Sequence, residues 1–176
     1  IAKKLAAADP SNTQWQRDLS VSYEKIGNIQ QAQGKLAEAL QSFQSYMAIA
    51  KKLAAADPSN TQWQRDLSIS YNKIGTIQQA QGKLAEALQS FQSDMTITQK
   101  LAAADPSNTQ WQTDIVVSCW KIANLGEAAG TVAYRRSLLE KGLSILKKLE
   151  ANNQLPEPET NKRWISIFEN AITNLK

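Results

Sequence analysis

Apolar residues recur along this chain at intervals of three and four, the spacing of one face of an α-helix. In residues 9–34, a turn followed by a long helix, this apolar stripe consists of Trp15, Leu19, Tyr23, Ile26 and Ile29. A second stripe follows in residues 35–57 and consists of Leu36, Ala39, Leu40, Phe43, Met47, Ala50 and Leu53. Because almost nothing separates the stripes, the pattern predicts two antiparallel helices of about 20 residues each, joined by a tight turn.

The predicted helix limits come from turn and capping residues. Asp9-Pro10 ends the preceding helix, since proline lacks an amide donor and biases the residue before it away from helical geometry. Ser11 and Gln14 have the spacing of a capping box, in which the Ser11 hydroxyl accepts an early amide of the new helix and Gln14 reaches back. Gly34 suits the left-handed conformation that often follows a helix.

The whole pattern repeats with a period of 48 residues, because Ile1, Ile49 and Ile97 open similar blocks. Such a period indicates stacked helical units rather than one globular core. Breaks are expected at Gly34, Gly82 and Gly130 and at Pro10, Pro58 and Pro106. The first two blocks differ only at Val21/Ile69, Glu24/Asn72, Asn28/Thr76, Tyr46/Asp94 and Ala48/Thr96.

The predicted organisation is one solenoid over residues 1–176. It comprises the end of a preceding helix at 1–9, repeats at 10–57 and 58–105, a divergent repeat at 106–153 and a capping helix at 157–176. The capping helix is predicted from Trp164, Phe168, Ile172 and Leu175, which keep helical spacing after a proline-containing connection. Ile1 falls inside a repeat, so we expect the chain to be a fragment of a longer protein.

The segment from Ser22 to Leu53 resembles a tetratricopeptide repeat. The large, Gly, small and aromatic positions of that family correspond here to Tyr23, Ile26-Gly27, Gly34, Ala39, Phe43 and, less well, Tyr46. The second block matches with Tyr71, Ile74-Gly75, Gly82, Ala87 and Phe91, whereas the third has Cys119, Ala123, Arg135 and Leu139 at such positions. The resemblance implies an all-α fold: a right-handed α-solenoid of antiparallel helix hairpins, with about three repeats and a C-terminal cap.

The repeat length departs from this family, whose usual repeat has 34 residues. The longer helices are similar to those of kinesin light chains and of many bacterial multi-repeat proteins, which favours a bacterial, cytoplasmic protein. The single cysteine suits a reducing compartment, and no apolar run is long enough for a membrane span. A net charge of +4 gives little support to a nucleic-acid partner.

Residues capable of chemistry favour structural roles. The chain has no histidine, the commonest general base, and no glycine-rich phosphate loop. Cys119 occupies a core position, and Trp15, Trp63 and Trp111 are better explained as packing wedges than as a ligand-stacking ladder. Asp18, Asp66 and Asp114 fall early in helices, where the dipole favours negative charge. The interpretation is a non-enzyme with no cofactor and no metal.

One pattern points to a partner. Three of the five differences between the first two blocks have the spacing i, i+3, i+7 of a single helix face. By resemblance, this face lines the concave groove of the array, and drift at an exposed face is the competing explanation. We call the predicted partner-binding residues the groove row: Arg17, Val21, Glu24, Asn28, Gln31, Arg65, Ile69, Asn72, Thr76, Gln79, Val117, Trp120, Asn124 and Glu127.

The leading hypothesis is a protein–protein interaction scaffold that binds a peptide or protein segment in the groove. Trp120 would either form the floor of a pocket for an apolar ligand side chain, which we favour, or cover the divergent cap. Two alternatives remain: a structural module that self-associates head to tail through its ends, and a regulatory sensor arm of a larger signalling protein.

Overall fold

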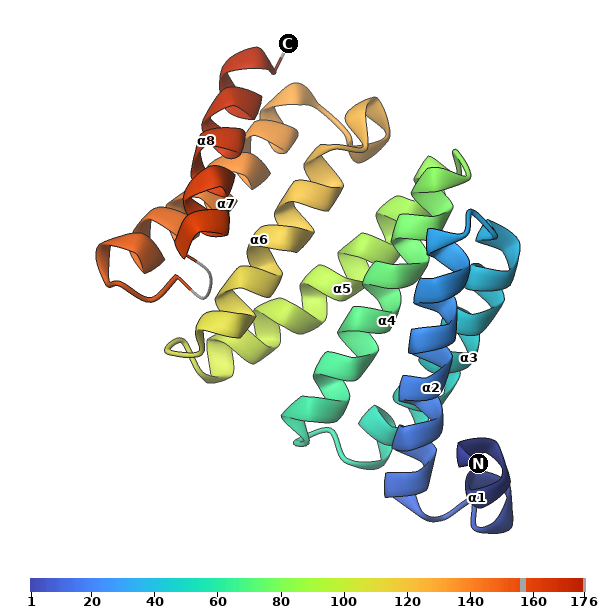
Figure 1. Cartoon of the computed structure of the whole chain (residues 1–176). Coiled ribbons are helices and arrows are strands. Elements are labelled where there is room, and N and C mark those ends of the chain that lie inside the picture. Colours follow the sequence, from blue (N-terminus) through green and yellow to red (C-terminus); the bar gives the residue numbers. More distant parts are fainter. Residues whose placement is uncertain (156–157, 176) are drawn as a thin grey trace. The chain divides into compact units, whose positions relative to one another are not determined.

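The computed structural model describes residues 1–155 and 158–175, without the side chains of 158–162. Every regular element in this part of the chain is helical, and it contains no strand. The elements are α1 (Ala2–Ala8), α2 (Thr13–Ala32), α3 (Leu36–Ala56), α4 (Thr61–Ala80), α5 (Leu84–Ala104), α6 (Thr109–Ala123), the 3₁₀ helix η1 (Gly126–Ala129), α7 (Val132–Ala151) and α8 (Pro158–Asn174) (Figure 1). The all-helical prediction is confirmed. Residues 157 and 176 of the predicted capping helix lie outside the described residues.

The chain divides into two compact units, residues 1–90 and 91–176, with the division inside α5. In the first unit, α1 packs on α2, α2 on α3, and α3 on α4. In the second unit, α6 packs on α7 and α7 on α8. Within each unit, helices that are neighbours in sequence are therefore neighbours in space, as the repeated stripes predict.

The three long helices that follow the prolines begin with the same cap, but it is not the predicted capping box. In each, an asparagine side chain accepts a hydrogen bond from the backbone amide of the tryptophan three residues later. The pairs are Asn12 and Trp15, Asn60 and Trp63, and Asn108 and Trp111, at 3.0, 3.0 and 3.2 Å. Asp9 accepts both the amide and the hydroxyl of Ser11, at 3.0 and 2.5 Å, which also lowers the pKa of Asp9. Because the Ser11 hydroxyl is bonded to Asp9, the next residue, Asn12, caps the helix instead.

The first two hairpins turn where the sequence predicts. Gly34 and Gly82 follow the helix ends with φ of +73° and +74°, a conformation that glycine adopts without a steric penalty. The third hairpin also breaks at Gly130, which has φ of +113° and stands two residues before α7, but α6 already ends at Ala123 and η1 fills residues 126–129. Gly126, with φ of +64°, corresponds to Gln78, which lies inside α4. The first helix of the third copy therefore ends earlier than its counterpart in the second copy, and η1 takes the place of its last residues.

The core of the first unit forms where α3 meets α4. Buried Ala39 and Phe43 cluster with Ile74 and Ile77, and Leu36, Leu40 and Met47 pack against them. The backbone of Gly27 lies so close to Phe43 that a Cβ there would come within 2.6 Å of the ring. In the second unit, Gly142 of α7 contacts Phe168 of α8 in the same way, and a Cβ at Gly142 would come within 2.4 Å of that ring. Both pairs set a close helix crossing.

Candidate functional site

The groove row lies at the partly accessible surface of α2 and α4. Its ten members on these two helices are all half-buried: Arg17, Val21, Glu24, Asn28, Gln31, Arg65, Ile69, Asn72, Thr76 and Gln79. Side chains in this class are accessible to a partner yet restrained by their neighbours. Two of the ten, Arg17 and Asn28, also make direct bonds between α2 and α4.

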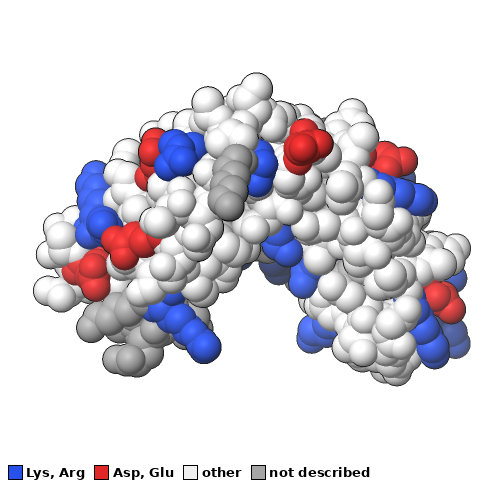
Figure 2. All heavy atoms as spheres, turned by 90° about the horizontal axis from the view of Figure 1, so that it is seen from above, with Lys and Arg blue, Asp and Glu red and all other residues white. Residues whose placement is uncertain are grey.

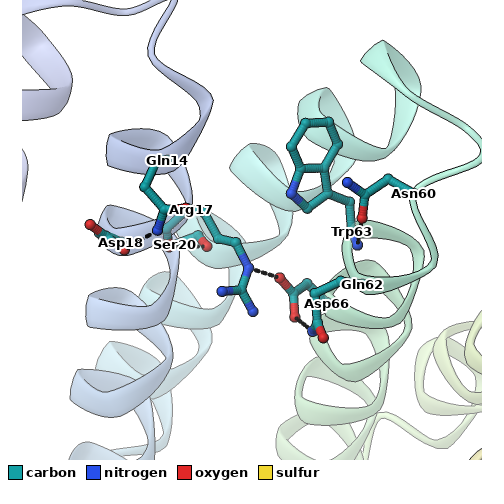
Figure 3. A network of polar contacts seen from close by, with 8 residues as sticks. All are labelled: Gln14, Arg17, Asp18, Ser20, Asn60, Gln62, Trp63 and Asp66. Atoms are coloured by element: carbon teal, nitrogen blue, oxygen red, sulfur yellow. Dashed lines mark hydrogen bonds and ion pairs between the residues drawn. The ribbon is translucent and has the colours of Figure 1, made fainter.

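Arg17 bridges α2 to α4. Its Nε donates to Asp66 Oδ2 at 2.8 Å, and the side chains are 31% and 8% exposed (Figure 3). Gln62 donates to the other carboxylate oxygen of Asp66 at 2.9 Å, so both oxygens of this buried group have partners. The structural role predicted for Asp66, a favourable position at the start of a helix, did not include this contact with Arg17. The sequence signal for this contact is that Arg17 and Asp66 carry opposite charges and lie 49 residues apart, which is one repeat plus one residue.

A second bridge joins the same helices nearer their C-terminal ends. Lys73 Nζ donates to Asn28 Oδ1 at 2.8 Å and also lies 6.0 Å from the centre of the Phe43 ring, a cation–π distance. Arg17 and Asn28, predicted as partner contacts, thus have structural partners. Between them on α2 lie Val21 and Glu24, the half-buried centre of the groove row in the first copy.

Beneath this surface, the two near-identical copies differ in their core. Tyr46 of α3 is fully buried, and burial raises the pKa of its hydroxyl, with the carboxylates of Asp66 and Glu24 acting in the same direction. The corresponding residue, Asp94, is also buried and accepts a hydrogen bond from Ser118 Oγ at 2.9 Å. The Tyr46/Asp94 difference is therefore a change of core packing rather than of the surface.

In the second unit, Trp120 packs inside an aromatic cluster. Its ring centre lies 5.3 Å from that of Trp164 and 5.2 Å from that of Phe168, both on α8. These contacts hold α6 against the closing helix, as expected from the alternative interpretation, in which Trp120 covers the divergent cap. The aromatic neighbours cover part of its large apolar surface, and Trp120 stays half-buried.

The remaining groove-row members of the second unit are more exposed. Val117 is 41% exposed and borders a cavity of about 40 Å³, together with Thr113, Val116, Leu146 and Trp164. This volume is far below the roughly 300 Å³ or more of a typical small-molecule site. Asn124 and Glu127 are exposed, and the Asn124 side chain donates to the Trp120 carbonyl at 2.8 Å, near the end of α6.

Two arginines of α7 have structural partners that the sequence did not reveal. Arg135 donates to the carbonyl of Ala123 at 3.3 Å, at the end of α6. Arg136 donates to the carbonyls of Ile172 and Leu175 at 3.2 and 3.4 Å, at the end of α8. Both cations thus satisfy carbonyls that a helix end leaves without intrahelical partners. Figure 2 shows acidic and basic side chains interspersed among uncharged ones on the face it draws.

Cys119 and the acidic side chains are the groups of the described residues most able to take part in chemistry. Cys119 is fully buried, and burial raises the pKa of its thiol to about 11, which disfavours the nucleophilic thiolate. Within the described residues, no three His, Cys, Asp or Glu side chains come together as a metal site would require. None of the helices described combines the length and apolar character needed to cross a bilayer.

No protein-family model matches this sequence, and no curated protein sequence matches it either.

Proposed function

We propose that this chain is a non-enzymatic scaffold that binds a peptide or protein segment along the groove row. In this proposal its hairpins form a right-handed superhelix of the tetratricopeptide-repeat kind, and the protein works in the cytoplasm. The observation that carries the proposal is where the first two copies differ. Three of five differences fall at half-buried positions of one helix face, Val21/Ile69, Glu24/Asn72 and Asn28/Thr76.

Two hydrogen bonds that hold the hairpins together are meanwhile the same in both copies. Ser42 donates to Gln30 at 2.6 Å and Ser90 to Gln78 at 2.7 Å. Gln16 and Gln64 each donate at 3.0 Å to a backbone carbonyl of the preceding helix, Ala6 or Ala54. A surface that distinguishes positions along a ligand is expected to vary in the side chains that it presents, while the hydrogen bonds that support it repeat.

The test begins with peptides selected against the whole chain from a random displayed library. Binding of the best peptide is then measured by fluorescence anisotropy for the variants Glu24→Lys and Asn72→Lys. We expect each variant to weaken binding at least about tenfold, since each places a long cation at the centre of the groove row. Gln41→Lys, at an exposed position of α3, is the matched control and should bind unchanged. Selected peptides that ignore both groove-row variants would refute the proposal.

A further inference from the structure

The small cavity of the second unit lies beside the groove row. It has a volume of about 40 Å³ and is lined by Thr113, Val116 and Val117 of α6, Leu146 of α7 and Trp164 of α8. Val117 belongs to the groove row and is 41% exposed, whereas Val116 and Leu146 are buried. The cavity is therefore bounded both by core side chains and by the surface to which the proposed function assigns the ligand.

This cavity lies where the earlier copies have an arginine. Thr113 corresponds to Arg17 of α2 and Arg65 of α4. In the first unit, the Arg17 side chain extends from α2 to α4, where its Nε donates to Asp66 at 2.8 Å (Figure 3). The Thr113 side chain is short, and its hydroxyl donates at 2.8 Å to the carbonyl of Gln110 on its own helix. The third copy thus leaves open the space into which the first copy extends a long side chain.

The lining of the cavity favours an apolar occupant over water or an ion. A buried water needs about two to four polar partners. The lining side chains of Val116, Val117 and Leu146 are aliphatic, and the Thr113 hydroxyl is already bonded to Gln110. None of the side chains that line the cavity within the described residues is charged. A charged group would therefore lose its hydration there without gaining a partner of opposite charge.

The size of the cavity limits the occupant further. One water-sized group needs at least about 10–15 Å³, so a volume of about 40 Å³ has room for about three such groups. The branched end of a valine, isoleucine or leucine side chain is of this size. An aromatic ring is too large to enter, and so is a typical small-molecule ligand.

We propose that this cavity is an anchor pocket, which receives one branched aliphatic side chain of the segment bound along the groove row. This inference rests on the proposed function and adds a requirement for the ligand: it carries a valine, isoleucine or leucine where it passes α6. Apolar anchors that fill a pocket supply a large share of the binding energy of many interfaces. The first copy has no such pocket at the corresponding place, because Arg17 occupies the position of Thr113.

The pocket is tested first without a peptide. Xenon binds in small apolar cavities and shifts the NMR signals of methyl groups beside it, so it is added to the whole chain with ¹³C-labelled valine and leucine methyl groups. We expect shifts at Val116, Val117 and Leu146. Thr113→Leu, whose larger apolar side chain fills the cavity, should remove these shifts. Thr96→Leu is the matched control and should retain them, because Thr96 is exposed on α5 and its hydroxyl also bonds a carbonyl of its own helix.

The anchor is then tested with the best peptide selected against the whole chain. Replacing one aliphatic residue of that peptide by alanine should weaken binding at least about tenfold, because it removes two or three buried carbon groups. The chain with Thr113→Leu should bind the parent peptide at least about tenfold more weakly, and the alanine replacement should then have little further effect. Thr113→Ser, which keeps the cavity open, and Thr96→Leu should both bind like the unchanged chain.

Three results would overturn the anchor pocket: the methyl groups do not shift under xenon, the peptide binds Thr113→Leu as tightly as the unchanged chain, or its critical residue is aromatic or charged. Peptides weakened by Glu24→Lys and Asn72→Lys but not by Thr113→Leu would refute the anchor pocket alone. Peptides that ignore all three variants would refute the proposed function as well. A selection that yields no binding peptide would also refute both, even where xenon enters the cavity.

Discussion

Among individual side chains, the Arg17–Asp66 pair makes the clearest prediction. Asp66 is buried and depends on Arg17 for its charged partner, although Arg17 itself remains partly exposed. We expect Arg17→Ala to lower the free energy of unfolding by about 1–3 kcal/mol, because it leaves a buried carboxylate with fewer partners. Lys25→Ala, at an exposed position on the same helix, should change it by no more than about 0.5 kcal/mol. Urea denaturation measures both, and equal effects would contradict the pairing.

Two buried side chains predict loss of stability at alkaline pH. Burial raises the pKa of Tyr46 above its ordinary 10.0 and that of Cys119 from 9.0 to about 11. The folded chain therefore keeps protons that the unfolded chain releases. Their contribution is fully present below about pH 9 and is lost as the pH rises through the range between about 9 and 11 and beyond. Tyr46→Phe should make the alkaline decline in unfolding free energy smaller. An identical decline in the two proteins would show that the Tyr46 hydroxyl ionises in the fold as it does in the unfolded chain.

Between neighbouring helices, burial depends on what is packed above a residue rather than on the residue itself. Ile29 and Ile77 occupy the same position in nearly the same sequence, yet are 59% and 0% exposed. We expect Ile77→Ala to cost about 2–5 kcal/mol, the range for deleting a buried aliphatic side chain. Ile29→Ala should cost less than about 1 kcal/mol. Thermal melts of the two variants give the comparison, and similar shifts would mean that Ile29 is covered in solution.

The same dependence explains how far the sequence could predict the helices. Stripes, prolines and Gly34 and Gly82 were enough to place α2, α3 and α4, because those signals are local. The cap at Asn12 was missed because Asp9 competes for the Ser11 hydroxyl, a choice that only turn geometry decides. The exposure of Ile26 could not be predicted from its stripe, since the stripe of Ile74 is the same.

The candidate site shows the same division between local and distant information. The position of the groove row on α2 and α4 follows from helical spacing. The partners of Arg17, Asn28 and Trp120 do not, because each lies on another helix, at separations of 49, 45 and 44 or more residues. A periodic sequence still offers a route to the first of these pairs, because Arg17 and Asp66 are residues of opposite charge about one period apart.

Across the whole molecule, two compact units predict that damage in one unit is felt there first. Trp120→Ala removes the ring that contacts Trp164 and Phe168, and should destabilise the second unit by on the order of 2–4 kcal/mol. Hydrogen exchange followed by mass spectrometry should show lost protection in α6, α7 and α8 and unchanged protection in α2 and α3. Trp120→Phe, which retains an aromatic ring, is the control and should keep most of the protection. Equal loss in both units would mean that the chain unfolds as one cooperative body, and unchanged protection would leave Trp120 free for the ligand contact that the sequence first suggested.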